Sequence, residues 1–385
     1  MRCTVDSAAL AAAIATGLPL VSTAGSKDGG KSGLLEHVEL TANDAGELVA
    51  RIAGMGAAVR VRVPAEVDAS GTCMPPAKAL HSALRRMDGD VAIWDEGIRV
   101  YVSAGKKRKA SLFSWADVDV YPTLLPPVPP DTRISAVSLG TVLDAVAHAQ
   151  ATERHPEHAG VHLEVGGGRV RAVATNHHRL AVAEAELAAA PHEAWTTTIA
   201  RDGVQVLQLA LAGDDGVLTY RAEDVELGFD PLSHRLGVYV GTTSIDARCL
   251  GQGWPGYASL LRPRGPDMAT VDRVALLQKL KLASIFLPHT RRLMLLMSEG
   301  KLTLHTHEVR TGDLVDSMVA QTAGRPRDVG INHRYLVDAL HALEDERVEL
   351  CFGASGTDAL VVRPVGRDDQ VEVIAPLQAA DAAAA

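Results

Sequence analysis

The clearest match to a chemical motif is a glycine-rich stretch near the N-terminus. Residues 25–32 read Gly-Ser-Lys-Asp-Gly-Gly-Lys-Ser and fit the GxxxxGKS pattern of phosphate-binding loops. In that motif the lysine, here Lys31, and the amides of a helix that begins beside it hold nucleotide phosphates. Residues 91–96, Val-Ala-Ile-Trp-Asp-Glu, imitate the acidic strand that binds the accompanying magnesium ion. A P-loop NTPase is therefore one hypothesis for this chain.

The residues that follow the glycine-rich stretch argue against nucleotide hydrolysis. Residues 36–41, Glu-His-Val-Glu-Leu-Thr, alternate in polarity as a strand does, and an Asn-Asp turn signal follows them. The motif needs a helix at this place. The chain as a whole also lacks the strand–helix alternation of a parallel sheet.

Histidines and cysteines predict neither a metal site nor a hydrolase. Imidazole is a common zinc ligand, but no cysteine or carboxylate stands at metal-site spacing from the clustered histidines, which are His155, His158, His162, His177 and His178. The four cysteines are widely separated, which indicates reduced thiols in a cytoplasmic protein. No GxSxG elbow is present. We expect no metal and no cofactor.

Length, composition and charge limit the classes of protein to which this chain could belong. The chain has 385 residues, of which 47% are hydrophobic and 22% charged, enough for two or three domains with their own cores. No apolar stretch is long enough to span a membrane. Asp6 interrupts the alanine-rich N-terminal run, so Ser7–Ala15 reads as a capped helix rather than a signal peptide. The net charge of −9 argues against a protein that coats nucleic acid with its whole surface, but it does not exclude one with a single basic face.

The chain repeats a strand followed by a helix three times. Val5, Val137 and Val271 mark the three strand–helix openings, which are spaced by 132 and 134 positions. This period is too long for a solenoid and fits a domain. The pattern predicts opening helices over residues 7–16, 139–150 and 274–284.

Each repeat continues in the same order, with paired strands, a second helix and closing strands. The paired strands are expected at 34–52, 160–186 and 293–306, the second helices at 76–87, 201–211 and 332–343, and the closing strands at 90–113, 216–247 and 347–374. Proline-rich linkers occupy 125–130 and 262–266. We predict an α+β fold of three repeated domains, at 1–127, 131–260 and 266–378, and a disordered tail at 379–385.

Four stretches resemble one family. Residues 174–182 (ATNHHRLAV), 254–257 (WPGY), 332–340 (NHRYLVDAL) and 373–377 (VIAPL) are similar, in this order, to segments of the beta sliding clamp of bacterial DNA polymerase III. The resemblance implies three clamp-type domains per chain, with antiparallel sheets outside and two helices of each domain lining a pore. It also implies a head-to-tail homodimeric ring, without enzymatic activity, that encircles double-stranded DNA as a processivity factor in DNA replication. The implied partners are the DNA polymerase III alpha subunit, the clamp loader, and other polymerases and repair proteins that carry a clamp-binding peptide.

The same resemblance implies basic side chains that face the pore. Scattered lysines and arginines attract phosphate without reading sequence, which permits sliding. The candidates are Lys27, Lys31, Lys78, Arg85, Arg86, Arg201, Lys279, Lys281 and Arg334. Lys78 and Arg85 are seven positions apart and thus share one helix face. The helix expected at 139–150 has neither lysine nor arginine, and ordinary solvated helix faces are the alternative.

Ring closure would join the first domain of one chain to the third domain of its partner. A head-to-tail contact repeated about a two-fold axis closes such a ring. The expected interface sets a basic edge strand against an acidic one, and its residues are Lys106, Lys107, Arg108, Lys109, Glu308, Asp313 and Asp316. The alternative is that the basic run only protects an edge strand from aggregation.

The partner site implied by the family is a groove between the second and third domains. Apolar pockets that anchor a few side chains of an extended peptide suit this role. Its expected wall is Thr175, His177, His178, Arg179, Leu180, Pro255, Leu260, Asn332, Tyr335, Val373, Ile374, Pro376 and Leu377. The wall departs from the family pattern at several places, with Asn176 for aspartate and His177 for glycine. A specialised or divergent clamp paralogue is therefore an alternative.

Overall fold

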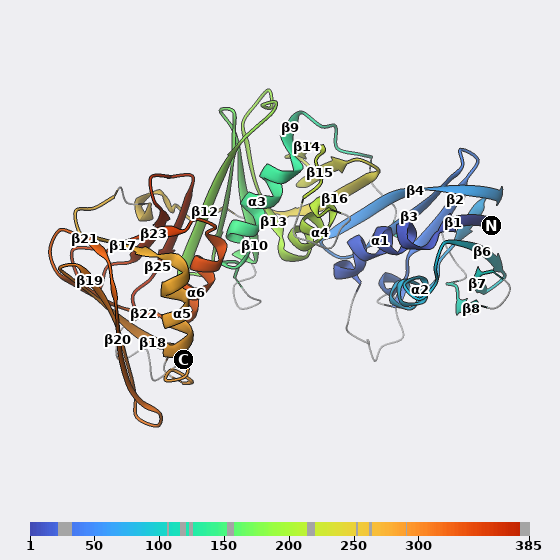
Figure 1. Cartoon of the computed structure of the whole chain (residues 1–385). Coiled ribbons are helices and arrows are strands. Elements are labelled where there is room, and N and C mark those ends of the chain that lie inside the picture. The colour runs from blue at the N-terminus through green and yellow to red at the C-terminus, as the bar shows by residue number, and fades with distance from the viewer. Residues whose placement is uncertain are drawn as a thin grey trace. The chain divides into compact units, whose positions relative to one another are not determined.

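The computed structural model describes residues 1–21, 33–105, 108–115, 121–122, 126–151, 158–213, 220–251, 253–261, 264–289 and 291–377. The chain divides into two compact units. The first unit comprises Met1–Gly140, Val165–Arg169 and Glu186–Gly251, and the second comprises Thr141–Glu164, Val170–Ala185 and Gln252–Ala385. Figure 1 shows the helices and strands along the chain.

Elements of the first unit follow the expected order. They are β1 (Arg2–Asp6), α1 (Ser7–Gly17), β2 (Glu39–Asn43), β3 (Glu47–Ala53), β4 (Ala57–Ala69), β5 (Gly71–Cys73), α2 (Ala77–Leu84), β6 (Asp90–Glu96), β7 (Arg99–Ala104), β8 (Arg108–Phe113), β9 (Thr132–Ser135), β13 (Trp195–Ala200), α4 (Arg201–Leu211), β14 (Asp224–Asp230), β15 (Arg235–Val240) and β16 (Thr243–Leu250). Four elements contribute residues to both units, namely α3 (Ala136–Ala147), β10 (Gly160–Gly166), β11 (Arg169–Thr175) and β12 (Arg179–Glu186).

The second unit contains the remaining elements. They are β17 (Met268–Asp272), α5 (Arg273–Ser284), β18 (Arg292–Ser298), β19 (Lys301–Glu308), β20 (Gly312–Val319), β21 (Gln321–Ala323), β22 (Arg327–Asn332), α6 (His333–Ala342), β23 (Arg347–Cys351), β24 (Leu360–Pro364) and β25 (Gln370–Ile374). No α-helix in the described part of the chain is both long and apolar enough to cross a membrane.

The repeated strand–helix opening is confirmed, and so is the α+β class. Strands β1, β9 and β17 lead directly into α1, α3 and α5. Two of these helices begin at an aspartate, because Asp6 accepts a hydrogen bond from the Ala9 amide at 2.8 Å and Asp272 accepts one from the Ala275 amide at 2.7 Å. Such caps satisfy amides that have no partner within the helix. The three-domain division remains a prediction.

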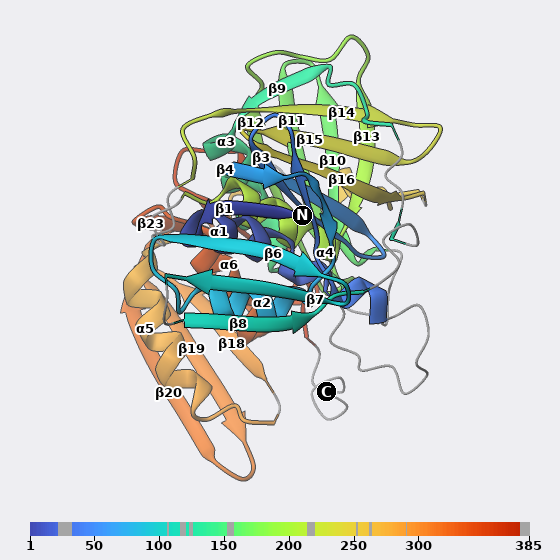
Figure 2. The same ribbon diagram turned by 90° about the vertical axis from the view of Figure 1, so that its right-hand side faces the viewer.

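The long strand β4 organises the sheet of the first unit. It pairs antiparallel with β3, with β1 and with β16. Strands β6, β7 and β8 continue from β1, as Figure 2 shows. Helices α1 and α2 pack together, and Leu10, Ile14, Leu80 and Ile93 are fully buried in the core of this unit.

The described residues do not support the P-loop hypothesis. A short 3-10 helix at Gly33–Glu36 leads into β2, so no α-helix begins just after the glycine-rich stretch. Residues 91–96, which resemble the acidic strand of a nucleotide site, lie in β6. This strand pairs antiparallel with β1 and β7. A phosphate-binding loop needs a strand followed by a helix. Residues 22–32 themselves lie outside the described residues.

The second unit sets two helices against a four-stranded antiparallel sheet in the order β20-β19-β18-β22. Helices α5 and α6 lie side by side (Figure 1). Their buried residues Leu276, Leu280, Leu336 and Leu340 join one core cluster with leucines of the sheet. A second group of antiparallel strands includes β17, β23, β24 and β25, and β25 also pairs with β12.

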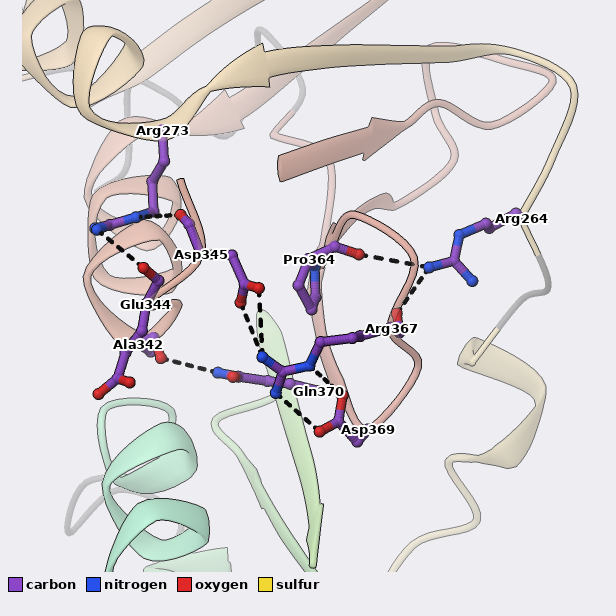
Figure 3. Close-up of polar contacts among 9 residues, drawn as sticks. All are labelled: Arg264, Arg273, Ala342, Glu344, Asp345, Pro364, Arg367, Asp369 and Gln370. Carbon is purple, nitrogen blue, oxygen red and sulfur yellow. Dashed lines mark hydrogen bonds and ion pairs between the residues drawn. The ribbon is translucent and has the colours of Figure 1, made fainter. Parts of the chain in front are cut away.

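Ion pairs fix the turn between β24 and β25, as Figure 3 shows. Arg367 contacts Asp369 at 2.8 Å and Asp345, which follows α6, at 3.3 Å. Gln370 donates a hydrogen bond to the carbonyl of Ala342 at 3.0 Å. These contacts tie the start of β25 to the end of α6. They therefore position the strand that forms part of the site described next.

Candidate functional site

An apolar pocket of about 250 Å³ lies within the second unit. It is lined by Thr175, His177, His178, Arg179, Leu180, Trp254, Pro255, Gly256, Tyr257, Leu260, Ala359, Val373 and Ala375. Eight of the residues expected from the sequence thus meet around one cavity.

Strand pairing brings the two halves of the pocket together. Strand β12 runs antiparallel to β25, with Leu180 opposite Val373. Both side chains belong to a buried cluster that also contains Tyr257, and Trp254 packs against that cluster. Leu260 is 45% exposed at the pocket edge. The floor is therefore fixed by long-range pairing, while the rim remains open to solvent.

A tight turn before β12 positions the polar rim. The Thr175 hydroxyl donates to the Arg179 carbonyl at 2.7 Å, and the Asn176 side-chain oxygen accepts from the Arg179 amide at 3.1 Å. His177 has a φ of +68° inside this turn. A residue with a side chain seldom adopts this left-handed conformation, which glycine adopts freely. His177 therefore holds its ring at the pocket with some backbone strain.

Aromatic and imidazole rings pack beside the pocket. The His158 Nδ1 and His177 Nε2 atoms are 3.1 Å apart, and the Trp254 ring stacks on His162 with centroids 4.9 Å apart. Burial lowers the pKa of His162 below its ordinary value. Among the described residues, no three His, Cys, Asp or Glu side chains are arranged to hold a metal ion, and His155 lies outside these residues.

Arg179 connects the pocket to helix α6. Its guanidinium lies 2.5 Å from the Asp338 carboxylate and 4.6 Å from the centre of the Tyr335 ring. It also donates to the carbonyl of His148. The His148 ring contacts Glu372 of β25 at 3.2 Å, and burial raises the pKa of Glu372. Arg179 thus links the pocket wall to helix α6 and to the carbonyl of His148, and we call this its bracing role.

Replacing Asp338 by asparagine is expected to destabilise the second unit by about 1–3 kcal/mol, because it leaves a mostly buried guanidinium without its counterion. The Arg179 side chain is 11% exposed. Urea unfolding would measure the change. Glu299→Gln removes the same charge from an exposed turn and serves as the control. Equal stability of the two variants would contradict the bracing role.

Five expected wall residues do not line the pocket. Asn332 caps α6 by accepting from the Arg334 amide at 3.1 Å, and Tyr335 lies beneath Arg179. Ile374 is buried, and Pro376 forms a bridge with Ile331 of β22. The Leu377 amide donates to the Gly330 carbonyl at 2.7 Å. The lining residues that sequence analysis missed are Trp254, Gly256, Tyr257, Ala359 and Ala375.

The expected basic residues divide into exposed and paired groups. Those with exposed side chains are Lys78, Arg85, Arg86, Arg201, Lys281 and Arg334. Lys281 and Arg334 line a cavity of about 470 Å³ between α5 and α6. Lys279 instead lies 2.7 Å from Asp316 in an intrachain ion pair. Lys27 and Lys31 lie outside the described residues.

The expected interface residues occupy two strand edges and one buried position. Arg108 and Lys109 lie on β8, whose only described pairing is with β7. Asp313 and Asp316 lie on β20, which is last in its four-stranded sheet. Glu308 was expected at that edge, but it ends the inner strand β19 and is 6% exposed. Burial of its side chain therefore excludes it from the edge, while Lys106 and Lys107 lie outside the described residues.

Several charged side chains of the expected interface already make contacts within the chain. The Lys109 ammonium lies 4.3 Å from the centre of the Tyr101 ring, and Arg108 is 3.3 Å from Asp88. Asp313 lies 2.5 Å from His307. Ion pairs on an exposed surface contribute little energy, so these contacts are easily exchanged.

The comparisons with known proteins all match this chain to the beta subunit of DNA polymerase III, and together they cover most of its length. Residues 261–378 match the family model described as the C-terminal domain of the DNA polymerase III beta subunit. The beta sliding clamp of Caulobacter vibrioides is 26% identical over 317 residues, which cover 78% of this chain and 81% of that protein. That of Synechococcus elongatus is 26% identical over 330 residues, covering 83% and 85%.

Solved structures show the same fold. The DNA polymerase III beta subunit of Thermotoga maritima aligns with a TM-score of 0.87 at 18% identity, covering 98% of this chain and 99% of that one. The subunit from Pseudomonas aeruginosa aligns with a TM-score of 0.85 at 21% identity, covering 98% and 100%. These likenesses show that the chain has the fold of the DNA polymerase III beta subunit, and its sequence is similar to beta sliding clamps over about four fifths of its length.

Proposed function

We propose that this protein is a DNA sliding clamp, which closes into a ring with a second copy, encircles duplex DNA, and holds partner proteins at the pocket of the second unit. The observation that carries this proposal is the pocket itself, because its lining comes from the segments that resemble the family. The ring would act in the cytoplasm as a tether without chemistry of its own. Its partners would be the DNA polymerase III alpha subunit, the clamp loader, and other polymerases and repair proteins.

The pocket suits short linear peptides better than folded surfaces. Its floor is formed by Leu180, Val373 and Tyr257, and its volume of about 250 Å³ fits a few anchoring side chains. Such anchors carry most of the energy in peptide recognition. The His177 and Trp254 side chains at the rim would adjust which peptides fit, and this supports a specialised paralogue as the second candidate.

The exposed cations on the helices would contact the DNA backbone. Lys281 and Arg334 lie on neighbouring helices and line the same cavity. Phosphate contacts of this kind ignore sequence and weaken with salt. Helix α3 carries no lysine or arginine, so contacts would be unevenly distributed.

Retention of the protein on circular but not on linear DNA tests whether it encircles the duplex. The full-length protein, loaded on a nicked circular plasmid by its clamp loader, should stay bound in gel filtration and should leave once the plasmid is linearised. Equal retention on both forms would reject the encircling ring. ATP turnover by the protein alone would contradict a tether without chemistry of its own.

Lys281→Gln combined with Arg334→Gln should weaken direct binding to duplex DNA and lower the slope of log affinity against log salt by about 2, because two phosphate contacts are lost. Fluorescence anisotropy with a labelled duplex measures the slope. Lys301→Gln with Arg325→Gln removes the same charge from exposed positions elsewhere in the second unit. A similar loss of slope in both double variants would place the DNA contacts elsewhere.

A further inference from the structure

The cavity between helices α5 and α6 has an apolar lining that contacts with DNA phosphates do not explain. Its volume of about 470 Å³ is typical of a small-molecule site. Val274, Leu277, Leu280 and Val337 supply its apolar surface, and Val274 is 50% exposed. Leu277 and Val337 also pack against the core of the second unit, which fixes their positions. Phosphate contacts need only exposed cations, so the apolar lining indicates a different kind of occupant.

Two cations stand at this cavity without a carboxylate partner. Lys281 and Arg334 come from different helices and are exposed, and neither forms an ion pair within the part of the chain that the structure describes. Asp338 is the carboxylate among the described lining residues. Arg179, which is not part of this lining, already contacts it at 2.5 Å. The lining therefore carries two cations and one carboxylate, and that carboxylate has a counterion of its own.

The other polar side chains of the lining do not offset this positive charge. They are Gln278, Ser284, His333 and His341, and none of them is an acid. His333 is 5% exposed, and burial lowers its pKa below the ordinary value, so its ring is uncharged at neutral pH. The cavity thus combines an apolar surface with a local excess of positive charge.

We propose that the α5–α6 cavity binds a small amphipathic anion, which has an apolar body and one carboxylate or sulfonate group. The apolar body would lie against Val274, Leu277 and Val337. The acidic group would accept charge-assisted hydrogen bonds from Lys281 and Arg334. A free phosphate ion fits less well, because it would leave the apolar lining in contact with water.

An occupant of this cavity would compete with duplex DNA. It would cover Lys281 and Arg334, the two cations assigned to phosphate contacts, and this consequence rests on the proposed function. Binding of the anion itself requires neither DNA nor a second copy of the chain. It can therefore be measured on the free protein.

Fluorescence titration of the full-length protein with 1-anilinonaphthalene-8-sulfonate, an amphipathic anion, tests the site at low salt. Lys281→Gln combined with Arg334→Gln should weaken binding of this probe about fivefold, as expected for two exposed charge contacts. Val274→Asp should weaken it at least about tenfold, because the substitution removes apolar surface and adds a charge of the same sign as the probe. Octanoate should displace the probe more strongly than octanol, which has the same chain length without the charge.

The chain offers matched controls for both changes. Val137 and Val274 are each the second residue of a helix, α3 and α5, and they are 48% and 50% exposed. Aspartate is favourable in the first turn of a helix, so Val137→Asp and Val274→Asp should both fold. Val137→Asp should bind the probe as the unaltered protein does. Lys301→Gln with Arg325→Gln, which removes two exposed charges elsewhere in the second unit, should do the same.

Three results would overturn the proposal. They are stronger displacement by octanol than by octanoate, equal weakening in the control variants, and loss of probe binding in Leu260→Asp, which would place the probe in the peptide pocket. Saturating octanoate should also weaken binding of a labelled duplex. If octanoate displaces the probe but duplex binding does not change, the phosphate contacts proposed at Lys281 and Arg334 are wrong and the anion site stands.

Discussion

Leu260→Asp is expected to weaken binding of a clamp-binding peptide from the polymerase alpha subunit about 30-fold. Leu260 lines the pocket and is 45% exposed, so the substitution places a charge at the anchor site without opening the core. Loss of one anchoring contact of about 2 kcal/mol gives this factor. Isothermal titration calorimetry with the full-length protein measures it.

Leu232→Asp provides the matched control for the pocket variant. Leu232 is 94% exposed in a turn of the first unit and does not line the pocket. It should bind the peptide as the unaltered protein does. Both variants should remain on circular DNA, because the pocket is separate from ring closure. A Leu260→Asp protein with undiminished peptide affinity would show that partners dock elsewhere.

Local signals made the helices and the repeat predictable. Asp6 and Asp272 each cap the helix that follows them, and residues 160–166 form β10 within the stretch where paired strands were expected. These features depend on neighbours in the sequence. The strand–helix order therefore could be read without knowledge of distant contacts.

Pairing between strands that are distant in the sequence explains why some pocket residues and ion-pair partners could not be predicted. Ala359 lines the pocket only because β24 and β25 run beside β12, and an alanine carries no motif. Lys279 and Asp316 were assigned to separate sites, yet they form one ion pair across 37 positions of sequence. Register between strands decides such partners, and register depends on the whole sheet.

Trp254 and Tyr257 lie between these two extremes, because their segment was recognised in the sequence but their place in the pocket was not predicted. Both belong to the Trp-Pro-Gly-Tyr segment that supported the family resemblance, but only Pro255 was expected in the wall. Their size and aromatic character could have identified them, since aromatic side chains dominate binding sites of this kind. The His177 ring was expected, but its left-handed backbone could not be inferred from residue type.

Val315→Lys is expected to weaken ring closure at least about tenfold. Val315 is 67% exposed on β20, the strand at the edge of its sheet. A lysine at an edge strand opposes pairing with another chain, and it would face the basic run that begins β8 in the partner. Analytical ultracentrifugation should show a shift from dimer to monomer at a given concentration, together with faster loss from circular DNA.

The ring and the pocket should respond independently to these changes. The control is Val365→Lys, which adds the same charge in the β24–β25 turn, where Val365 is 42% exposed. It should leave the dimer intact. The Val315→Lys protein should bind the partner peptide normally, because the pocket lies within one chain. A monomer that still remained on circular DNA would contradict topological tethering, since an open half-ring has nothing to hold the duplex except salt-sensitive charge.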